Sequence, residues 1–264
     1  MSRLFASICN QPQALSKALE PVENGLIAKG PIARWGLGYA HLGEVCLRLH
    51  PKGDDEGINF YDEIRSIKAD YIIGAALPKA DGLKGNANTQ PFRFRRWLFA
   101  QTGESPKLAE ARATLIDRIP GYLQRNIKGK TSQEFLFHLF LATLHEDGTI
   151  NNPNLEVDQV RDALARTLEV VRSEVGDAKI DNIICSNSRV MLGACLGTPL
   201  YVCRLSHQMD PKRPESAFRA VLVVSSDENP GEGFEPIPVG QTVAIKRSVH
   251  ADILPLKPEA KPEE

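Results

Sequence analysis

The second residue of the chain, Ser2, could serve as an N-terminal nucleophile. Aminopeptidases usually remove an initiator methionine that precedes a residue as small as serine, and this would leave Ser2 with a hydroxyl and a free α-amine. A free α-amine has a pKa of about 8 and can act as general base for the neighbouring hydroxyl. Serine is also common at position two, so Ser2 alone leaves a nucleophile and an ordinary terminal residue both open.

The first hundred residues must supply the strands that hold such a terminus. Two strand-like segments flank a turn at residues 41–43, which predicts a β-hairpin. Two compact apolar runs have the length of buried strands, and the turn-rich residues 79–91 between them predict a long loop. The predicted strands cover residues 3–9, 35–40, 44–49, 71–77 and 96–100.

Helices are predicted in the middle of the chain, over residues 107–119, 132–145 and 157–175. The second is apolar nearly all round, which is typical of a buried helix. The third is amphipathic and ends near Gly176.

Strands return after Asp181, over residues 182–186, 190–195, 199–205, 218–225 and 242–246. Strands followed by helices and then strands predict an α+β protein with antiparallel sheets covered by helices. We expect one domain over residues 1–255 and a disordered charged tail over residues 256–264.

The composition argues against several kinds of partner. Lys plus Arg number 32 and Asp plus Glu number 33, so no overall charge favours a nucleic acid or an anionic membrane. The five cysteines form no CxxC pair and lie in apolar segments, which predicts reduced core thiols. No apolar run is long enough to span a membrane. We therefore expect a cytoplasmic protein without cofactor or metal, and without a nucleic-acid or membrane partner.

Two further features have the residue types of binding sites. The run Arg93-Phe94-Arg95-Arg96-Trp97 could bind phosphate or nucleic acid, but its place at the entry to a buried strand favours a solvated loop. His138 lies in the apolar helix, where a hydrogen-bonded core histidine is expected rather than a metal ligand.

Several short motifs occur together in the order and spacing of one protein family. They are residues 1–5, 35–39, 88–92, 99–103, 131–134 and 223–226. With them the chain resembles the single-domain class II glutamine amidotransferases over roughly residues 1–250. The resemblance implies the N-terminal-nucleophile hydrolase fold, a four-layer αββα sandwich, in agreement with the predicted order of strands and helices.

The resemblance also implies a catalytic apparatus. In active members an N-terminal cysteine attacks the side-chain amide of glutamine, with its own α-amine as base. An Asn-Gly pair forms the oxyanion hole, an arginine holds the substrate carboxylate, and an acidic residue holds the substrate amino group. These groups are needed together, because attack on an amide builds negative charge that preorganised donors must already face.

Most of these positions carry other residues in this chain. The resemblance places Ser2 at the nucleophile, Leu77 at the arginine and Ser132 at the acidic residue. A serine hydroxyl is far less acidic than a thiol, and neither leucine nor serine can make the ion pair expected at its position.

The oxyanion hole is also altered. Gly103 is kept, Thr102 replaces the asparagine, and Gln101 stands where the family has histidine. The retained Trp35 and Gly36 belong to the substrate-binding hairpin of the family and read here as scaffold.

These replacements favour a degenerate family member, a pseudoenzyme that keeps the fold and acts as a binding or assembly module. Its partner would be an unidentified protein or a second copy of the chain. An amide hydrolase using Ser2 on a substrate other than glutamine stays open, with Gln101 or Thr102 as oxyanion donor. Engineered loss of a catalytic cysteine would explain Ser2 but not Leu77, Thr102 or Ser132.

Overall fold

The computed structural model describes residues 3–22, 27–28, 32–41, 44–52, 58–77, 83–207 and 217–257. Within these residues, two antiparallel sheets of seven and six strands account for most of the β-structure. The first sheet has the order β13 (Phe234–Ile237), β11 (Leu200–His207), β12 (Phe218–Ser225), β1 (Arg3–Cys9), β6 (Tyr71–Leu77), β3 (Arg34–His41) and β4 (Glu44–His50). The second has the order β15 (Ala251–Pro255), β14 (Gln241–Lys246), β10 (Val190–Cys195), β9 (Asn182–Ser186), β8 (Trp97–Thr102) and β7 (Phe92–Phe94). The short strands β2 (Ile27–Ala28) and β5 (Ile58–Asn59) pair with each other.

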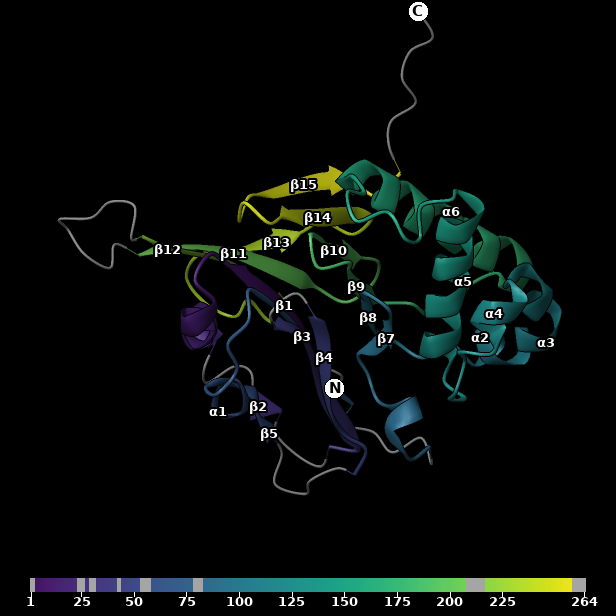
Figure 1. Cartoon of the computed structure of the whole chain (residues 1–264), viewed down its shortest axis with the longest axis horizontal. Coiled ribbons are helices and arrows are strands. Elements are labelled where there is room, and N and C mark those ends of the chain that lie inside the picture. The colour runs from purple at the N-terminus through teal and green to yellow at the C-terminus, as the bar shows by residue number, and fades with distance from the viewer. Residues whose placement is uncertain are drawn as a thin grey trace, which may run out of the picture.

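Helices cover the outer faces of the two sheets (Figure 1). The second sheet is covered by α5 (Ser132–Glu146) and α6 (Val157–Val175), together with α2 (Pro106–Glu110), α3 (Arg112–Leu115), η3 (Ile116–Arg118) and α4 (Gly121–Gln124). The first sheet is covered by the 3-10 helix η1 (Pro12–Val22) and by α1 (Phe60–Ile64). A further 3-10 turn, η2 (Asn86–Asn88), lies in the loop before β7. The predicted α+β sandwich of four layers is confirmed.

The core between the sheets follows from the two-residue period of β-strands. In β1, Leu4 and Ala6 face the second sheet, where Leu98 and Ala100 of β8 meet them. Phe5 points to the opposite face and packs on Phe60 with a ring-centroid distance of 5.0 Å. Since β1 is buried on both faces and pairs with β6 and β12, its start is held inside the sandwich.

Helix α5 is the predicted buried helix. Its side chains from Ser132 to Leu144 are all buried, and Phe137 stacks on Phe99 of β8 at 5.2 Å. His138 is 3% exposed and its Nδ1 lies 2.9 Å from the Glu134 carbonyl oxygen. The prediction of a hydrogen-bonded core histidine is confirmed.

The structure departs from the predicted elements in several places, and it adds the short elements η1, α1, α4, β2, β5 and β7, which the sequence did not predict. The predicted helix over residues 107–119 is divided into α2, α3 and η3. Leu108 and Leu115 are buried, but the residues between them are exposed or half-buried, so the core anchors only the ends of this stretch. Strands β13 and β15 were not predicted, because each is short and only partly buried on the edge of its sheet.

Most of the predicted tail lies outside the described residues. Its first two members are described: Leu256 donates its backbone N–H to the Gly240 carbonyl at 2.9 Å, and Lys257 forms an ion pair with Glu169 of α6.

Candidate functional site

The start of β1 lies beside the end of β6 and the start of β3. Leu4 pairs with Ala75, which pairs with Gly36, while Leu77 pairs with Arg34. Leu4 and Ala75 face the second sheet. Because side chains alternate along a strand, Arg34, Gly36 and Leu77 lie on the same inner face. Ser2 lies outside the described residues.

Arg34 is a buried cation that the sequence analysis did not select. It is 2% exposed, and its Nη1 donates to the Leu83 carbonyl at 2.6 Å. It pairs with Leu77 on the adjacent strand, the position at which the resemblance implies an arginine. This guanidinium therefore binds a backbone carbonyl of the loop that precedes β7.

The two retained hairpin positions have different roles. Trp35 points to the outer face, where its ring stacks on His50 at 3.9 Å and meets Phe60 edge-on at 5.9 Å. At Gly36, a Cβ would lie 2.4 Å from the Gln90 carbonyl oxygen. The glycine is required because the loop before β7 crosses this strand closely.

Three buried side chains, which we call the backbone clamp, fasten the loops around this end of the sandwich. Asn88 donates to the Lys84 carbonyl at 2.8 Å and accepts from the Lys130 N–H at 2.8 Å. Gln90 accepts from the Gln101 N–H at 2.6 Å and donates to the Gln101 carbonyl at 3.0 Å.

Glu134 is the third member of the backbone clamp. Its carboxylate accepts from the backbone N–H groups of Lys128 at 2.8 Å and Gly129 at 2.6 Å. Burial raises the pKa of Glu134 above its usual value, and these two hydrogen bonds oppose the rise.

Ser132 begins α5 close to the strand end that carries Gly103. The hydroxyl of Ser132 accepts from the Ser105 N–H at 3.4 Å, and the next residue, Gln133, donates to the Gly103 carbonyl at 2.9 Å. Thr131 caps the helix by accepting from the Glu134 N–H at 3.1 Å.

Strand β8 ends at Thr102, and Gly103 follows it. Gly103 has a φ of +88°, and a Cβ there would lie 2.8 Å from the Lys179 carbonyl oxygen, so glycine preserves the backbone path. Thr102 is 4% exposed and points to the inner face, while Gln101 points toward the helices.

Thr102 belongs to a group of buried polar residues that we call the inner polar cluster. It pairs across the sheet with Asn182, whose Nδ2 donates to Thr198 Oγ1 at 2.8 Å and to Ser225 Oγ at 3.5 Å. Within the described residues, Thr102 Oγ1 and Asn182 Oδ1 have no hydrogen-bond partner. Sequence reasoning missed Asn182, because its neighbours come from strands distant in the chain.

Four of the five cysteines are buried. All five are free, and burial raises the pKa of Cys185 to about 12 and that of Cys9 to about 11. A thiol protonated at neutral pH is a poor nucleophile. No three His, Cys, Asp or Glu side chains in the described ranges gather closely enough to hold a metal ion. No helix among those ranges is both long and apolar enough to cross a membrane.

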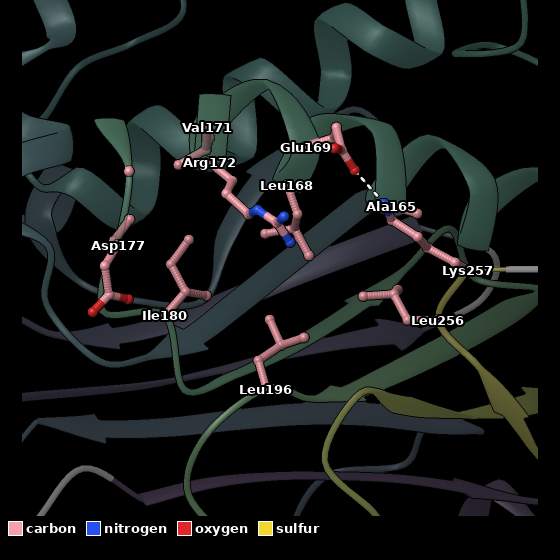
Figure 2. Close-up of a pocket in the computed structure, with 12 residues that line it drawn as sticks. Ala165, Leu168, Glu169, Val171, Arg172, Asp177, Ile180, Leu196, Leu256 and Lys257 are labelled. Atoms are coloured by element: carbon pink, nitrogen blue, oxygen red, sulfur yellow. Dashed lines mark hydrogen bonds and ion pairs between the residues drawn. The ribbon is translucent and has the colours of Figure 1, made fainter. Parts of the chain in front are cut away.

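A pocket of about 680 Å³ lies elsewhere, between α6 and the turns at the edge of the second sheet (Figure 2). Leu168, Ile180, Leu196 and Leu256 give it an apolar lining. Its volume suits a small molecule, but it is on the helical side of the sheet, away from the inner face that carries Thr102.

Comparison with known proteins identifies the architecture. No protein-family model matches the chain, and no curated protein matches it. A glutamine aminotransferase class-II domain protein from Silicibacter pomeroyi superposes with a TM-score of 0.59 at 16% identity, over 97% of this chain and 100% of the other. A predicted glutamine amidotransferase from Pseudomonas aeruginosa gives 0.56 at 15% identity, over 96% and 99%.

The glutamine phosphoribosylpyrophosphate amidotransferase of B. subtilis gives a TM-score of 0.56 at 14% identity, over 97% of this chain and 49% of the longer enzyme. The chain thus spans about half the length of that relative. At these identities the shared property is the fold, and its order of strands and helices agrees with the sandwich described above. The chain has the fold of class II glutamine amidotransferase domains.

Proposed function

We propose that this protein is a class II glutamine amidotransferase-like pseudoenzyme that does not hydrolyse glutamine and acts as a binding or assembly module. The observation that carries the proposal is the pair Arg34 and Leu77. The position expected to hold the substrate carboxylate is apolar, and the arginine beside it hydrogen-bonds to the Leu83 carbonyl.

The expected loss is large enough to silence the chemistry. A hydrogen bond to a charged group is worth roughly 1.5–3 kcal/mol, and an arginine clamp on a carboxylate makes two. Removal of one oxyanion donor costs on the order of 10²–10³ in rate, and Thr102 is shorter than the asparagine it replaces. Ser2 adds a less acidic nucleophile to these losses.

A glutaminase assay tests the loss of activity. Ammonia release from glutamine should be the same for the wild-type protein and for Ser2→Ala, and both should equal the buffer background. Ser2→Cys should stay inactive as well, because Leu77 and Thr102 are unchanged. Release by the wild type that Ser2→Ala abolishes would contradict the proposal.

The binding role requires its own measurement. Sedimentation velocity of the purified chain reports a homodimer directly, and affinity capture followed by mass spectrometry reports a different partner. A complex of fixed stoichiometry that Ser2→Ala leaves intact would support a module that works without chemistry. A chain that stays monomeric and captures no stoichiometric partner would contradict this role.

One observation favours a second candidate, an amide hydrolase that uses Ser2 and its α-amine on another amide. Thr102 offers an unpartnered hydroxyl on the inner face at the end of β8, where an oxyanion donor would stand. Intact-mass measurement provides the first test, because a retained Met1 blocks the α-amine and contradicts this candidate. If Met1 is absent, hydrolysis of an amide panel that falls about 10²-fold in Thr102→Val would support it.

A further inference from the structure

A small hollow of about 130 Å³ lies where the turn between β7 and β8 meets the loop between α5 and α6. Arg95 and Arg96 line it from the turn, Asn151 and Asn152 from the loop, and Asn187 from the turn that follows β9. We propose that this hollow binds a phosphate-type anion, either inorganic phosphate or the phosphoryl group of a small molecule. The proposal does not depend on the proposed function.

The pairing of the strands brings the two turns together. Leu98 of β8 pairs with Ser186 of β9, so the residues just before β8 and just after β9 lie at the same end of the second sheet. Trp97 holds the loop between α5 and α6 in place. Its indole Nε1 donates to the Ile150 carbonyl at 3.1 Å, and its ring meets Phe140 of α5 edge-on at 5.4 Å. The walls of the hollow are therefore held by buried contacts.

The three asparagines present donors because their oxygens are already used. Asn187 Oδ1 accepts from the backbone N–H groups of Arg189 at 3.1 Å and Val190 at 3.0 Å. Asn152 Oδ1 accepts from the Asn154 N–H at 2.9 Å.

Asn151 Oδ1 accepts from Arg95 Nη1. In all three cases the partner can only donate, which fixes which end of the amide is oxygen. The remaining NH₂ groups of these asparagines donate to no group in the described part of the chain.

Asn187 is the decisive member of this group. It is 5% exposed, and its Nδ2 is buried without a hydrogen-bond partner in the described residues. An unpaired buried donor costs about 1–3 kcal/mol, so an acceptor that reached it would recover that energy. Because Asn187 lines the hollow, an anion bound there would supply such an acceptor.

The charge of the hollow favours an anion over a neutral acceptor. Its lining contains two guanidinium groups and no carboxylate. Arg96 is exposed and has no hydrogen bond or ion pair to any described residue, so it is available for a ligand. A planar guanidinium and several N–H donors match the geometry of a tetrahedral oxyanion.

The hollow is distinct from the inner polar cluster. Trp97 begins β8 at the hollow and Thr102 ends it at the cluster, and a strand of this length spans roughly 17 Å. The run Arg93 to Trp97, expected from sequence to be a solvated loop, thus contributes to a binding site through two of its arginines.

Isothermal titration calorimetry of the full chain, with inorganic phosphate and with phenyl phosphate in chloride buffer, tests the proposal. One-to-one binding of either anion is expected. Binding of phenyl phosphate as tightly as phosphate identifies a phosphoryl group of a larger molecule, and exclusion of phenyl phosphate identifies the free anion. Absence of binding for both anions would overturn the proposal, even if an oligonucleotide bound.

Two variants and a matched control locate the site. Asn187→Asp keeps the oxygen that accepts from Arg189 and Val190 but replaces the donor by a carboxylate oxygen. Arg96→Gln removes an exposed cation. Each should weaken binding by about 10- to 100-fold, whereas Arg219→Gln on β12 of the other sheet, with the same loss of charge, should leave it unchanged.

Equal weakening in the control would mean that net charge alone attracts the anion and would overturn the site. Unchanged affinity in Arg96→Gln would also overturn it. Thermal unfolding of each variant is measured in parallel. If Asn187→Asp does not fold, Arg96→Gln carries the test alone, because an exposed side chain without a hydrogen bond or ion pair to the described residues is not needed for folding.

Discussion

Gln90 and Glu134 of the backbone clamp are about as deeply buried as Thr102 and Asn182 of the inner polar cluster, but their polar atoms are paired differently. Gln90 and Glu134 are 2% and 4% exposed, and each makes two hydrogen bonds to backbone groups. Thr102 and Asn182 are 4% and 0% exposed, and each leaves one oxygen without a partner in the described residues. Burial alone therefore does not separate the two regions.

The difference bears on which polar groups the fold needs. The clamp fixes the loops that approach α5 and β8. The cluster lies on the inner face at the end of β8 and leaves two oxygens unpaired within the described part of the chain. We infer that the fold depends more on the paired polar groups of the clamp than on the unpaired oxygens of the cluster.

Loss of the Glu134 carboxylate should give the largest effect. Glu134→Ala leaves the buried N–H of Gly129 and the part-buried N–H of Lys128 without acceptors, and the free energy of unfolding should fall by about 3–5 kcal/mol. Urea denaturation measures the change. Glu110→Ala serves as the matched control, because Glu110 is exposed on α2 and should change stability by less than about 0.5 kcal/mol. If both variants lose the same free energy of unfolding, Glu134 stabilises the fold no more than an exposed surface residue does.

A second test concerns the close approach that the clamp maintains. Gly36→Ala places a Cβ 2.4 Å from the Gln90 carbonyl oxygen and should destabilise the protein by about 2–3 kcal/mol. Gly121→Ala at the start of α4 meets no heavy atom within 4 Å and should be neutral or slightly stabilising. Thermal unfolding distinguishes them, and a tolerated Gly36→Ala would show that the loop before β7 is loosely held.

Some parts of the fold and site could be predicted from the sequence, and others could not. The strands around Phe5 and Phe99 and the apolar helix α5 were predicted because local apolar patterns determine them. The inner polar cluster was not predicted, because Thr198 and Ser225 lie 16 and 43 residues away from Asn182 along the chain. Arg34 was missed for a similar reason: its hydrogen bond to Leu83 crosses 49 residues.

Among the described residues, the buried side chain of His138 has one paired and one unpaired ring nitrogen. Its Nδ1 donates to the Glu134 carbonyl, while Nε2 is buried without a partner in the described residues. Burial lowers the pKa of His138 below 6.5, and the nearby Arg112 adds to this.

The folded state therefore holds His138 neutral while the unfolded chain takes up a proton below pH 6.5. Its contribution to stability is complete above that pH and is lost as the pH falls, by up to about 1.4 kcal/mol per pH unit. Urea denaturation at pH 5 and pH 7.5 should show a larger acid loss for the wild type than for His138→Leu. Equal losses would show that His138 can be protonated in place.

Thr102→Val should give the smallest change and the opposite sign. Valine has nearly the shape of threonine, and the substitution removes a buried hydroxyl that has no hydrogen-bond partner in the described residues. The free energy of unfolding should rise by up to about 1 kcal/mol, because the desolvated hydroxyl no longer opposes folding. Thr131→Val is the matched control, since the Thr131 hydroxyl caps α5 by accepting from the Glu134 N–H, and its loss should cost about 1 kcal/mol. If Thr102→Val destabilises the protein as much as the control does, the Thr102 hydroxyl is paired in solution and the inner polar cluster is structural like the clamp. If it stabilises the protein, the unpaired hydroxyl of Thr102 is carried at a cost to folding, in contrast to the paired polar groups of the clamp.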